Sequence, residues 1–512
     1  MTGLGTSRGV ALVGMTGHVV GVEAHLAATV PGFALIGLPD TALSEARDRV
    51  RAAVTSSGLA WPQKRVTVNL SPASLPKHGA GFDLAIAVAV LAGAGLVDAT
   101  APRGVVHLGE LGLDGRVHPV RGVLPAVVAA VAAGVRRVVV ATADVAEARL
   151  VPGVEVRGVS CLAELAYAYG ADIPEPAEVR TPVMRPARVQ REPAGDLEDV
   201  LGQHEARAAL EIAAAGGHHL LMVGPPGAGK TMLASRLPGL LPDLSEAEAV
   251  EVTAVHSVAG TFDPGEGLVR RPPFEDPHHT ATAAALVGGG SGVPRPGAAS
   301  RAHRGVLFLD ECPEFGARVL QTLRQPLEEG ELVIHRAGGA ARFPARFQLV
   351  LAANPCPCGL AVGQGLRCTC TPVQRRRYFS RVQGPLLDRV DLQVEVAGVS
   401  RVDLDQAAPG ESTAAVAARV ARARAAARER LAGTPWRLNG EVPGRHLRSL
   451  LGRGGGVLAD VDRALDRGMI SLRGADRVLR IAWTIADLAG RDRPDRQDVG
   501  RALALRTRGE VR

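Results

Sequence analysis

Residues 220–231 read LLMVGPPGAGKT, a short apolar run that leads into a glycine-rich turn and a lysine. The last eight residues match G-x-x-x-x-G-K-[ST], a pattern that binds phosphate when a strand precedes it and a helix follows. Its main-chain N–H groups and helix N-terminus face the phosphates, its lysine reaches the β- and γ-phosphates, and its hydroxyl binds Mg²⁺. The stretch predicts an α/β nucleotide-binding domain. Its phosphate-binding residues would be Gly224, Pro225, Pro226, Gly227, Ala228, Gly229, Lys230 and Thr231.

Two further apolar runs end in polar residues that suit the same site. Residues 305–309 lead into Asp310 and Glu311, and residues 347–353 lead into Asn354. Continuous apolar runs of this length are typical of strands that are covered on both faces of a parallel sheet. We expect Asp310 to bind Mg²⁺ and Glu311 to accept a proton from the attacking water. The neutral amide of Asn354 can orient that water or contact the γ-phosphate.

Composition excludes several other classes of protein. The chain has 512 residues, of which 46% are apolar and 22% charged, so it is neither disordered nor collagen-like. The first residues carry no signal sequence, and the longest apolar run, residues 84–97, is too short to cross a bilayer. We therefore expect a cytoplasmic protein without a membrane partner.

The positive charge of the chain is concentrated at its end. Residues 401–512 hold 22 arginines against 14 acidic residues, whereas the whole chain has a net charge of +7. Such an excess suits a polyanion such as nucleic acid, but a compositional bias towards arginine gives the same excess. Charge alone leaves both interpretations open.

Prolines and periodicity divide the chain into four parts. Residues 1–170 alternate β-branched runs with alanine-rich helical stretches, which predicts an α/β domain. Residues 171–195 contain five prolines and are interpreted as a linker. Residues 196–398 form the predicted nucleotide-binding domain. In residues 399–512 the strand signal fades and helical spacing remains, which predicts an α-helical domain.

Four of the six cysteines form two C-x-C pairs that are separated by residues 359–367. Four thiolates suit tetrahedral Zn²⁺, but this spacing is tighter than the usual C-x₂-C. A structural zinc site and a loop of reduced thiols both remain open, and zinc would stiffen the loop after Asn354. The four residues are Cys356, Cys358, Cys368 and Cys370.

These residues together resemble the AAA+ ATPases of the magnesium-chelatase and MCM-like branch, and specifically the YifB/ComM family. The resemblance covers nearly the whole chain and includes GPLLDR at residues 384–389, the helix near residue 472, and the stretches 277–290 and 354–359. It implies a P-loop core with a helical lid, Mg²⁺-dependent ATP hydrolysis and a homo-oligomeric, hexameric ring.

The resemblance also implies roles for three residues outside the phosphate loop. Asn354 would be sensor 1, Arg389 the arginine finger that reaches a neighbouring subunit's γ-phosphate, and Arg473 sensor 2 in the lid. A planar cation delivered across a subunit joint stabilises the charge of the transition state. The structural alternatives are an ion pair of Arg389 with a nearby aspartate and a solvated helix face for Arg473.

A hairpin is expected between Asp310 and the strand that ends at Asn354, and an insert is expected upstream of Asp310. Residues 331–336 and 340–343 predict a β-hairpin with a glycine turn, in which Arg336 and Arg342 are either DNA contacts or exposed residues. In this AAA+ branch the hairpin and the insert point into the ring pore. The role of His278 and His279 in the insert is also left open: they are either contacts made by the insert or ordinary surface histidines.

The first 170 residues resemble the Lon-protease-type domain at the front of YifB/ComM proteins. The positions that match the Lon serine and lysine hold Gly81 and Leu124, so a Ser/Lys dyad cannot form. This domain is expected to be inactive and to serve as a platform for assembly or nucleic-acid binding.

The resemblance favours a motor that remodels or moves along branched or single-stranded DNA, similar to the ComM branch-migration helicase of natural transformation and recombination. One alternative is a chelatase-type ATPase that works through a protein partner, since the chain lacks the D-x-S-x-S pattern of a metal-adhesion site. Another is a nucleotide-switched scaffold.

Overall fold

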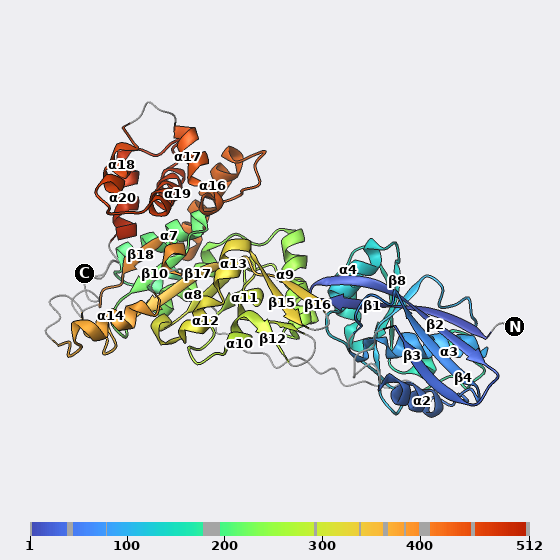
Figure 1. Cartoon of the computed structure of the whole chain (residues 1–512). Helices are drawn as coiled ribbons and strands as arrows, with labels where there is room; N and C mark the ends of the chain where they lie inside the picture. The colour runs from blue at the N-terminus through green and yellow to red at the C-terminus, as the bar shows by residue number, and fades with distance from the viewer. Residues whose placement is uncertain are drawn as a thin grey trace.

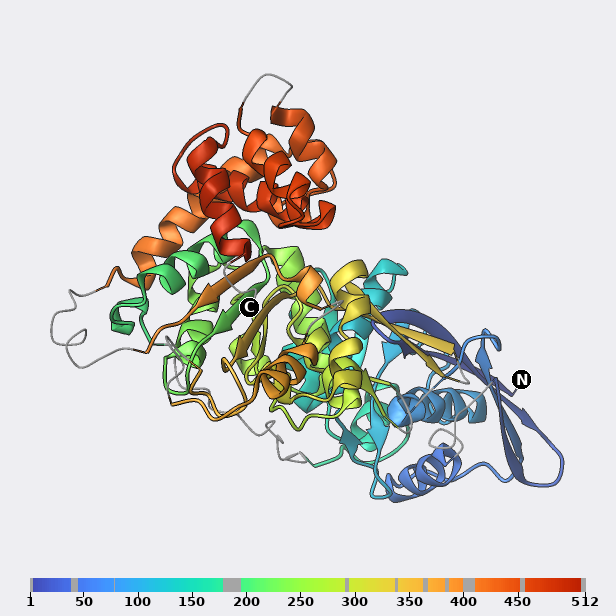
Figure 2. The same ribbon diagram turned by 60° about the vertical axis from the view of Figure 1, so that its left-hand side comes forward.

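The computed structural model describes residues 3–37, 45–77, 79–177, 195–290, 294–336, 339–361, 367–382, 386–398, 410–451 and 456–507. Within these ranges the chain forms an N-terminal α/β unit, a central α/β core and a helical lid (Figure 1). Figures 1 and 2 show the lid standing on the core, away from the N-terminal unit. Most of the predicted linker, residues 178–194, lies outside the described residues, as do residues 399–409 between core and lid.

The core is built on a five-stranded parallel sheet with the order β11-β14-β17-β10-β18. Because all strands run the same way, their carboxyl ends share one edge, called here the carboxyl edge, and their amino ends share the opposite, amino edge. The strands are β10 (Leu220–Val223), β11 (Phe274–Glu275), β14 (Val306–Leu309), β17 (Gln348–Ala353) and β18 (Leu392–Glu395).

Both faces of this sheet are buried. In β14, Val306 and Phe308 enter one apolar cluster, which also includes lid residues, while Leu307 and Leu309 enter a second cluster on the other face. This two-sided burial explains why the strands are continuous apolar runs in the sequence.

Helices and two ribbons complete the core. The predicted hairpin is confirmed, with β15 (Glu331–Arg336) antiparallel to β16 (Gly339–Pro344). The short ribbon β12 (Gly288–Gly289) and β13 (Arg295–Pro296) belongs to the insert. The helices are α7 (His204–Gly216), α8 (Lys230–Leu240), α9 (Glu246–Ala259), α10 (Ala283–Val287), α11 (Ala298–Arg301), α12 (Ala317–Gln321), α13 (Arg324–Glu329) and α14 (Pro372–Ser380).

The lid is helical, and its longest apolar face belongs to α19. Arg430 donates to both carboxylate oxygens of Asp487, at 2.6 and 2.7 Å, and its guanidinium lies 4.4 Å from the ring centroid of Trp483. This buried ion pair ties α16 to α19. The lid helices are α16 (Thr413–Arg430), α17 (Gly444–Leu451), α18 (Ala459–Asp466), α19 (Leu472–Leu488) and α20 (Arg496–Thr507).

The N-terminal unit has two sheets. The first is β1-β2-β4-β3, formed by β1 (Leu4–Val13), β2 (Thr16–Ala27), β4 (Arg65–Ser71) and β3 (Gly32–Ile36). The second is the parallel sheet of β5 (Val105–His107), β8 (Arg137–Ala141) and β9 (Glu155–Val159), with the ribbon β6 (Glu110–Leu111) and β7 (Val117–His118) nearby. The helices are α2 (Ala46–Ser56), α3 (Asp83–Ala94), which is buried from Asp83 to Ala92, α4 (Val123–Ala132), α5 (Val145–Ala148) and α6 (Leu162–Ala168).

The N-terminal unit docks on the core through α4, which packs on α9. The Ser257 hydroxyl of α9 donates to the carboxylate of Glu147, and burial raises the pKa of that carboxyl group. The N–H of Met15, in the β1–β2 turn, donates to the carbonyl of Arg342 in the hairpin at 3.2 Å. The N-terminal unit therefore contacts the hairpin in the middle of β16. None of the described helices is long and apolar enough to span a bilayer.

Candidate nucleotide site

The glycine-rich loop connects β10 to α8 at the carboxyl edge of the sheet. Gly227 and Gly229 have φ angles of 75° and 87°, which side chains other than glycine rarely adopt. This backbone turns the chain so that α8 begins at Lys230 with its first N–H groups lacking partners inside the helix. The loop is thus built as an anion site.

Lys230 lies buried beneath this loop. Its Nζ donates to the carbonyls of Gly224 at 2.7 Å and Pro225 at 2.9 Å, and to Oδ1 of Asn354 at 3.1 Å. Burial lowers the pKa of Lys230, and the nearby carboxylates of Asp310 and Glu311 oppose this shift. The ammonium group therefore joins the loop to the end of β17, where the sequence placed Asn354.

Thr231 and Asp310 form the second contact across the site. The Thr231 hydroxyl donates to Oδ2 of Asp310 at 2.6 Å, and the other carboxylate oxygen accepts the N–H of Glu311 at 2.8 Å. A hydroxyl and a carboxylate are the oxygen ligands that Mg²⁺ uses beside nucleotide phosphates. The two side chains fit that ion, as the sequence predicted.

Glu311 follows Asp310 in a strained backbone conformation, with φ 49° and ψ 42°. Its carboxylate is about half exposed, and Oε2 lies 3.3 Å from Nδ1 of His279. The His279 ring also lies against that of His278, with 4.1 Å between the centroids. The sequence left the role of this histidine open, and only its family-specific PHHT motif singled it out. The structure places it beside the proposed general base.

Arg389 lies at the amino edge, away from this site. It ends a short turn, Leu387–Arg389, that precedes β18, and β18 runs parallel to β10. A strand of four residues spans about 13 Å, so Arg389 and the phosphate loop occupy opposite edges. Arg389 is paired with Glu328 of α13.

Arg473 lies in the first turn of α19 and is exposed. Burial lowers the pKa of Arg389, and the charges of Arg324 and Arg473 lower it further. Arg473 therefore lies close enough to Arg389 for their charges to interact. The two predicted arginines share the amino edge, whereas Lys230 and Asn354 meet at the carboxyl edge.

A buried ion pair holds these two arginines in their places. Asp391 follows Arg389 by two residues, and its Oδ1 lies 3.1 Å from Nε of Arg477, one turn after Arg473. The N–H of His219 donates to Oδ2 of Asp391 at 3.2 Å. The pair joins the end of the core that carries Arg389 to the lid helix that carries Arg473.

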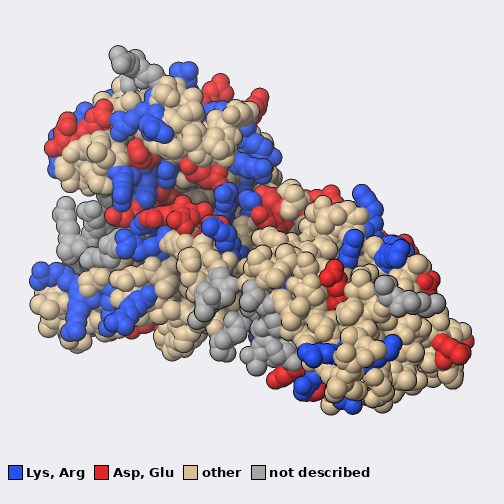
Figure 3. Space-filling model, turned by 45° about the vertical axis from the view of Figure 1, so that its right-hand side comes forward, with Lys and Arg blue, Asp and Glu red and all other residues tan. Residues whose placement is uncertain are grey.

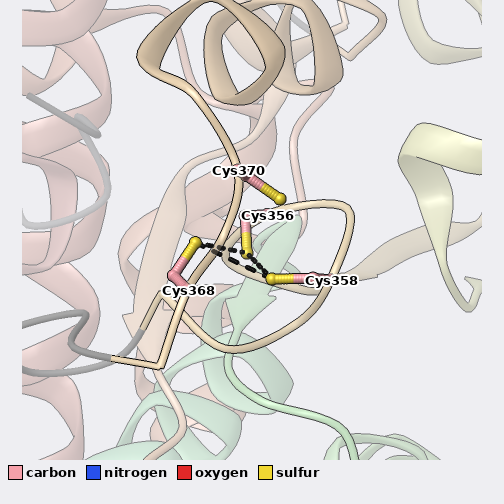
Figure 4. A group of neighbouring side chains, drawn as sticks. All are labelled: Cys356, Cys358, Cys368 and Cys370. Atoms are coloured by element: carbon pink, nitrogen blue, oxygen red, sulfur yellow. Dashed lines mark hydrogen bonds between the residues drawn. The ribbon is translucent and has the colours of Figure 1, made fainter.

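The four predicted zinc ligands lie together beside the end of β17 (Figure 4). All four Sγ atoms lie within 4.8 Å of one another, and three of the separations are 3.3, 3.6 and 3.7 Å. This group, called here the cysteine cluster, consists of Cys356, Cys358, Cys368 and Cys370. Its donor set can hold a zinc ion.

The N-terminal unit places Gly81 and Leu124 where the Lon resemblance put a serine and a lysine. Gly81 lies beside Val120, and Leu124 is buried in α4. The nearby Lys77 is also buried, and its Nζ donates to the carbonyls of three residues, including Gly37 at 2.9 Å. An ammonium bound in this way is not available as a base, so these residues supply no dyad.

Three family models match successive parts of the chain. The sequence matches the family models described as "Subunit ChlI of Mg-chelatase" over residues 22–144, "Magnesium chelatase, subunit ChlI" over residues 196–404, and "Magnesium chelatase, subunit ChlI C-terminal" over residues 410–506. An uncharacterized protein of Mycobacterium tuberculosis is 51% identical over 509 residues, which cover 99% of this chain and 100% of that protein.

The competence protein ComM of Haemophilus influenzae is 40% identical over 504 residues, 97% of this chain and 96% of that protein. The chain belongs to the YifB/ComM family. The uncharacterized protein YifB of Escherichia coli has the same identity over 506 residues, with 97% and 96% coverage. Lon protease 2 of Bacillus subtilis is 31% identical over 154 residues, 28% of this chain and 26% of that protein.

Membership of this family confirms the predicted fold class at the level of a magnesium-chelatase AAA+ ATPase domain preceded by a ChlI-type domain. The similarity to a Lon protease is partial. ATP and Mg²⁺ are the ligands that the ATPase family implies, and the Thr231–Asp310 contact fits the ion.

Proposed function

We propose that this YifB/ComM protein hydrolyses ATP in a ring of identical subunits and uses the cycle to remodel or move along DNA. The observation that carries the proposal is the division of the predicted residues between two edges of one sheet. Lys230, Thr231, Asp310 and Asn354 meet at the carboxyl edge, while Arg389 lies at the amino edge.

At the carboxyl edge each side chain has a distinct part in hydrolysis. Lys230 would exchange its carbonyl contacts for the phosphate oxygens of ATP, while the first N–H groups of α8 donate to the same phosphates. Mg²⁺ held by Thr231 and Asp310 would neutralise part of the phosphate charge. Glu311 then accepts the proton of the attacking water, and Asn354 orients that water.

The contact between His279 and Glu311 bears on the rate of this step. A carboxylate that is engaged with an imidazole is a poorer acceptor for a proton from water, because the contact occupies one of its lone pairs. The insert that carries His279 thus has direct access to the proposed base. Movement of the insert would free Glu311 for water.

In the proposed ring, the amino edge of one subunit supplies positive charge to the nucleotide site of the next subunit. A subunit whose amino edge faces the phosphate loop of the next copy brings Arg389, and beside it Arg473, towards that copy's γ-phosphate. Arg389 would exchange Glu328 for the phosphate. Two different edges in contact form a head-to-tail interface, which closes into a ring when the rotation permits. The hexamer is the ring that the family resemblance implies.

Charge supports DNA as the polymer on which the ring acts. On the face drawn in Figure 3, basic side chains gather at the end of the core where Figure 1 labels α14, and the lid shows basic and acidic side chains together. The N-terminal unit shows mostly uncharged surface in that view. A basic surface attracts the phosphate backbone without regard to sequence.

The test is the rate of ATP hydrolysis by the full chain with single-stranded, duplex and branched DNA, and without DNA. Stimulation by branched or single-stranded DNA, with unwinding of the branched substrate, is the expected result, and Lys230→Ala is the inactive control. The three magnesium-chelatase family matches favour a second candidate, a chelatase-type motor. A rate of ATP hydrolysis that does not change with DNA and rises only when a protein partner is added would support that second function.

A further inference from the structure

The cysteine cluster has the size of a site for one metal ion. A tetrahedral zinc–thiolate centre has Zn–S bonds of about 2.3 Å, which places its sulfur atoms about 3.8 Å apart. The separations of 3.3, 3.6 and 3.7 Å among Cys356, Cys358 and Cys368 are close to this value. Sulfur atoms this close leave room for a single ion and not for a cluster of iron and sulfide.

The cysteine cluster lies in the segment that connects Asn354, at the end of β17, to helix α14. Cys356 is buried and follows Asn354 by two residues, and Cys370 directly precedes Thr371, which caps α14. From α14, Tyr378 returns to Asn354 and accepts a hydrogen bond from its main-chain N–H. Asn354, which binds Lys230, is thus followed directly by the cysteine cluster and contacted by α14.

The same loop is in contact with the phosphate loop. Gly359, between the two cysteine pairs, is buried with a φ of 76° and lies against the ring of Pro226. A Cβ added at Gly359 would lie 2.6 Å from Cδ of Pro226, where ordinary contacts begin at about 3.4 Å. The turn between the two cysteine pairs therefore packs directly on the glycine-rich loop, through Gly359 and Pro226.

We propose that the cysteine cluster binds Zn²⁺ and that the zinc-closed loop holds the phosphate loop in shape, so that ATP turnover depends on zinc and on reduced thiols. The four thiols lose their protons when the ion binds, and the resulting centre carries two negative charges. Arg375, whose Nε donates to the carbonyl of Cys370 at 3.2 Å, provides positive charge beside it. The proposed ATPase function is the basis for the dependence on zinc, but not for the metal site itself.

Zinc content is the first measurement, made on the full chain purified under reducing conditions. We expect about one zinc per chain, its loss in Cys368→Ser, and its retention in Cys161→Ser, a buried thiol of the N-terminal unit. Replacement by Co²⁺ is expected to give the visible absorption of a tetrahedral thiolate site. Freshly isolated, reduced protein without zinc, or a cluster found as two disulfides, would overturn the metal site.

Coupling to the phosphate loop is tested separately with Gly359→Ala, which leaves the thiols in place. The added methyl group must displace Pro226 by about 1 Å, and a shift of this size can reduce turnover by about 10- to 100-fold. We expect this loss with zinc retained, and a similar loss when zinc is removed by a chelator and its reversal on adding zinc. Gly170→Ala is the matched control, because Gly170 also has a positive φ, of 83°, but has open space around it.

Different results would contradict the zinc dependence of turnover and the proposed ATPase function. Unchanged turnover in Gly359→Ala and in the zinc-depleted protein would overturn the coupling. A wild-type chain that binds zinc but hydrolyses no ATP would contradict the proposed function and leave the metal site established. A chain that hydrolyses ATP at its full rate without zinc would contradict this inference alone.

Discussion

Replacing Asp391 by asparagine tests the buried ion pair with Arg477 that connects the core to the lid. Asp391 is 4% exposed, and its Oδ1 lies 3.1 Å from Nε of Arg477, whose side chain is 12% exposed. Although burial opposes the shift, His218 and Arg477 hold the pKa of Asp391 well below its ordinary value. Burial in turn lowers the pKa of Arg477 to about 10, and Asp391 opposes that shift. The variant keeps the shape of the side chain and leaves Arg477 buried without its counter-charge.

Removing one member of a buried ion pair costs about 3–5 kcal/mol of the free energy of unfolding. At about 2–4 °C per kcal/mol for a unit of 150–250 residues, the unfolding midpoint of the core and lid should fall by about 10 °C. The pair joins the turn of Arg389 to the helix of Arg473, so ATP turnover should fall as well. Nucleotide binding at the distant phosphate loop should be retained.

Calorimetry of the full chain measures this midpoint, and Asp492→Asn is the control because it removes an exposed carboxylate of the lid. The low pKa of Asp391 also fixes the dependence on pH. Its contribution is complete above about pH 5 and is lost as the pH falls below the ordinary aspartate pKa near 4. A midpoint within about 2 °C of the control, or an equal pH dependence in wild type and variant, would refute this reasoning.

Four further substitutions separate the roles of other residues. Glu311→Gln should keep ATP binding and lower turnover by about 10²- to 10⁴-fold, whereas Lys230→Ala should lose binding; equal loss of binding in both would contradict the assigned roles. His279→Ala should raise turnover in the absence of DNA by about two- to tenfold, because it removes the imidazole nitrogen that lies 3.3 Å from the carboxylate of the base. A lower rate would count against competition for Glu311. Lys77→Ala should lower the unfolding midpoint of the N-terminal unit, because it removes the ammonium donor that three carbonyls share, and an unchanged midpoint in calorimetry would show that water replaces the ammonium group.

Much of the core could be predicted because its signals are local. The predicted strand at residues 220–223 has the bounds of β10, since an apolar run ends sharply at a glycine turn. The contacts of Lys230 with Asn354 and of Thr231 with Asp310 follow from parallel strands, whose carboxyl ends meet at one edge. Residues 124 positions apart were thereby brought together without knowledge of the packing.

Contacts between loops could not be predicted in this way. Arg389 is paired with Glu328 of α13, a residue 61 positions away that the sequence did not suggest as a partner. The approach of His279 to Glu311 and the packing of Gly359 on Pro226 depend on how two loops fold over the sheet edge. No periodicity or local propensity encodes such contacts.

The most direct test of the central claim is the ATPase rate of mixtures of two inactive proteins. Arg389→Ala retains an intact phosphate loop, and Lys230→Ala retains an intact arginine. If one subunit binds ATP and the next supplies the guanidinium, mixed rings regain activity that neither protein has alone, and the gain depends on the mixing ratio. Mixtures that form mixed rings but show no gain at any ratio would contradict the account.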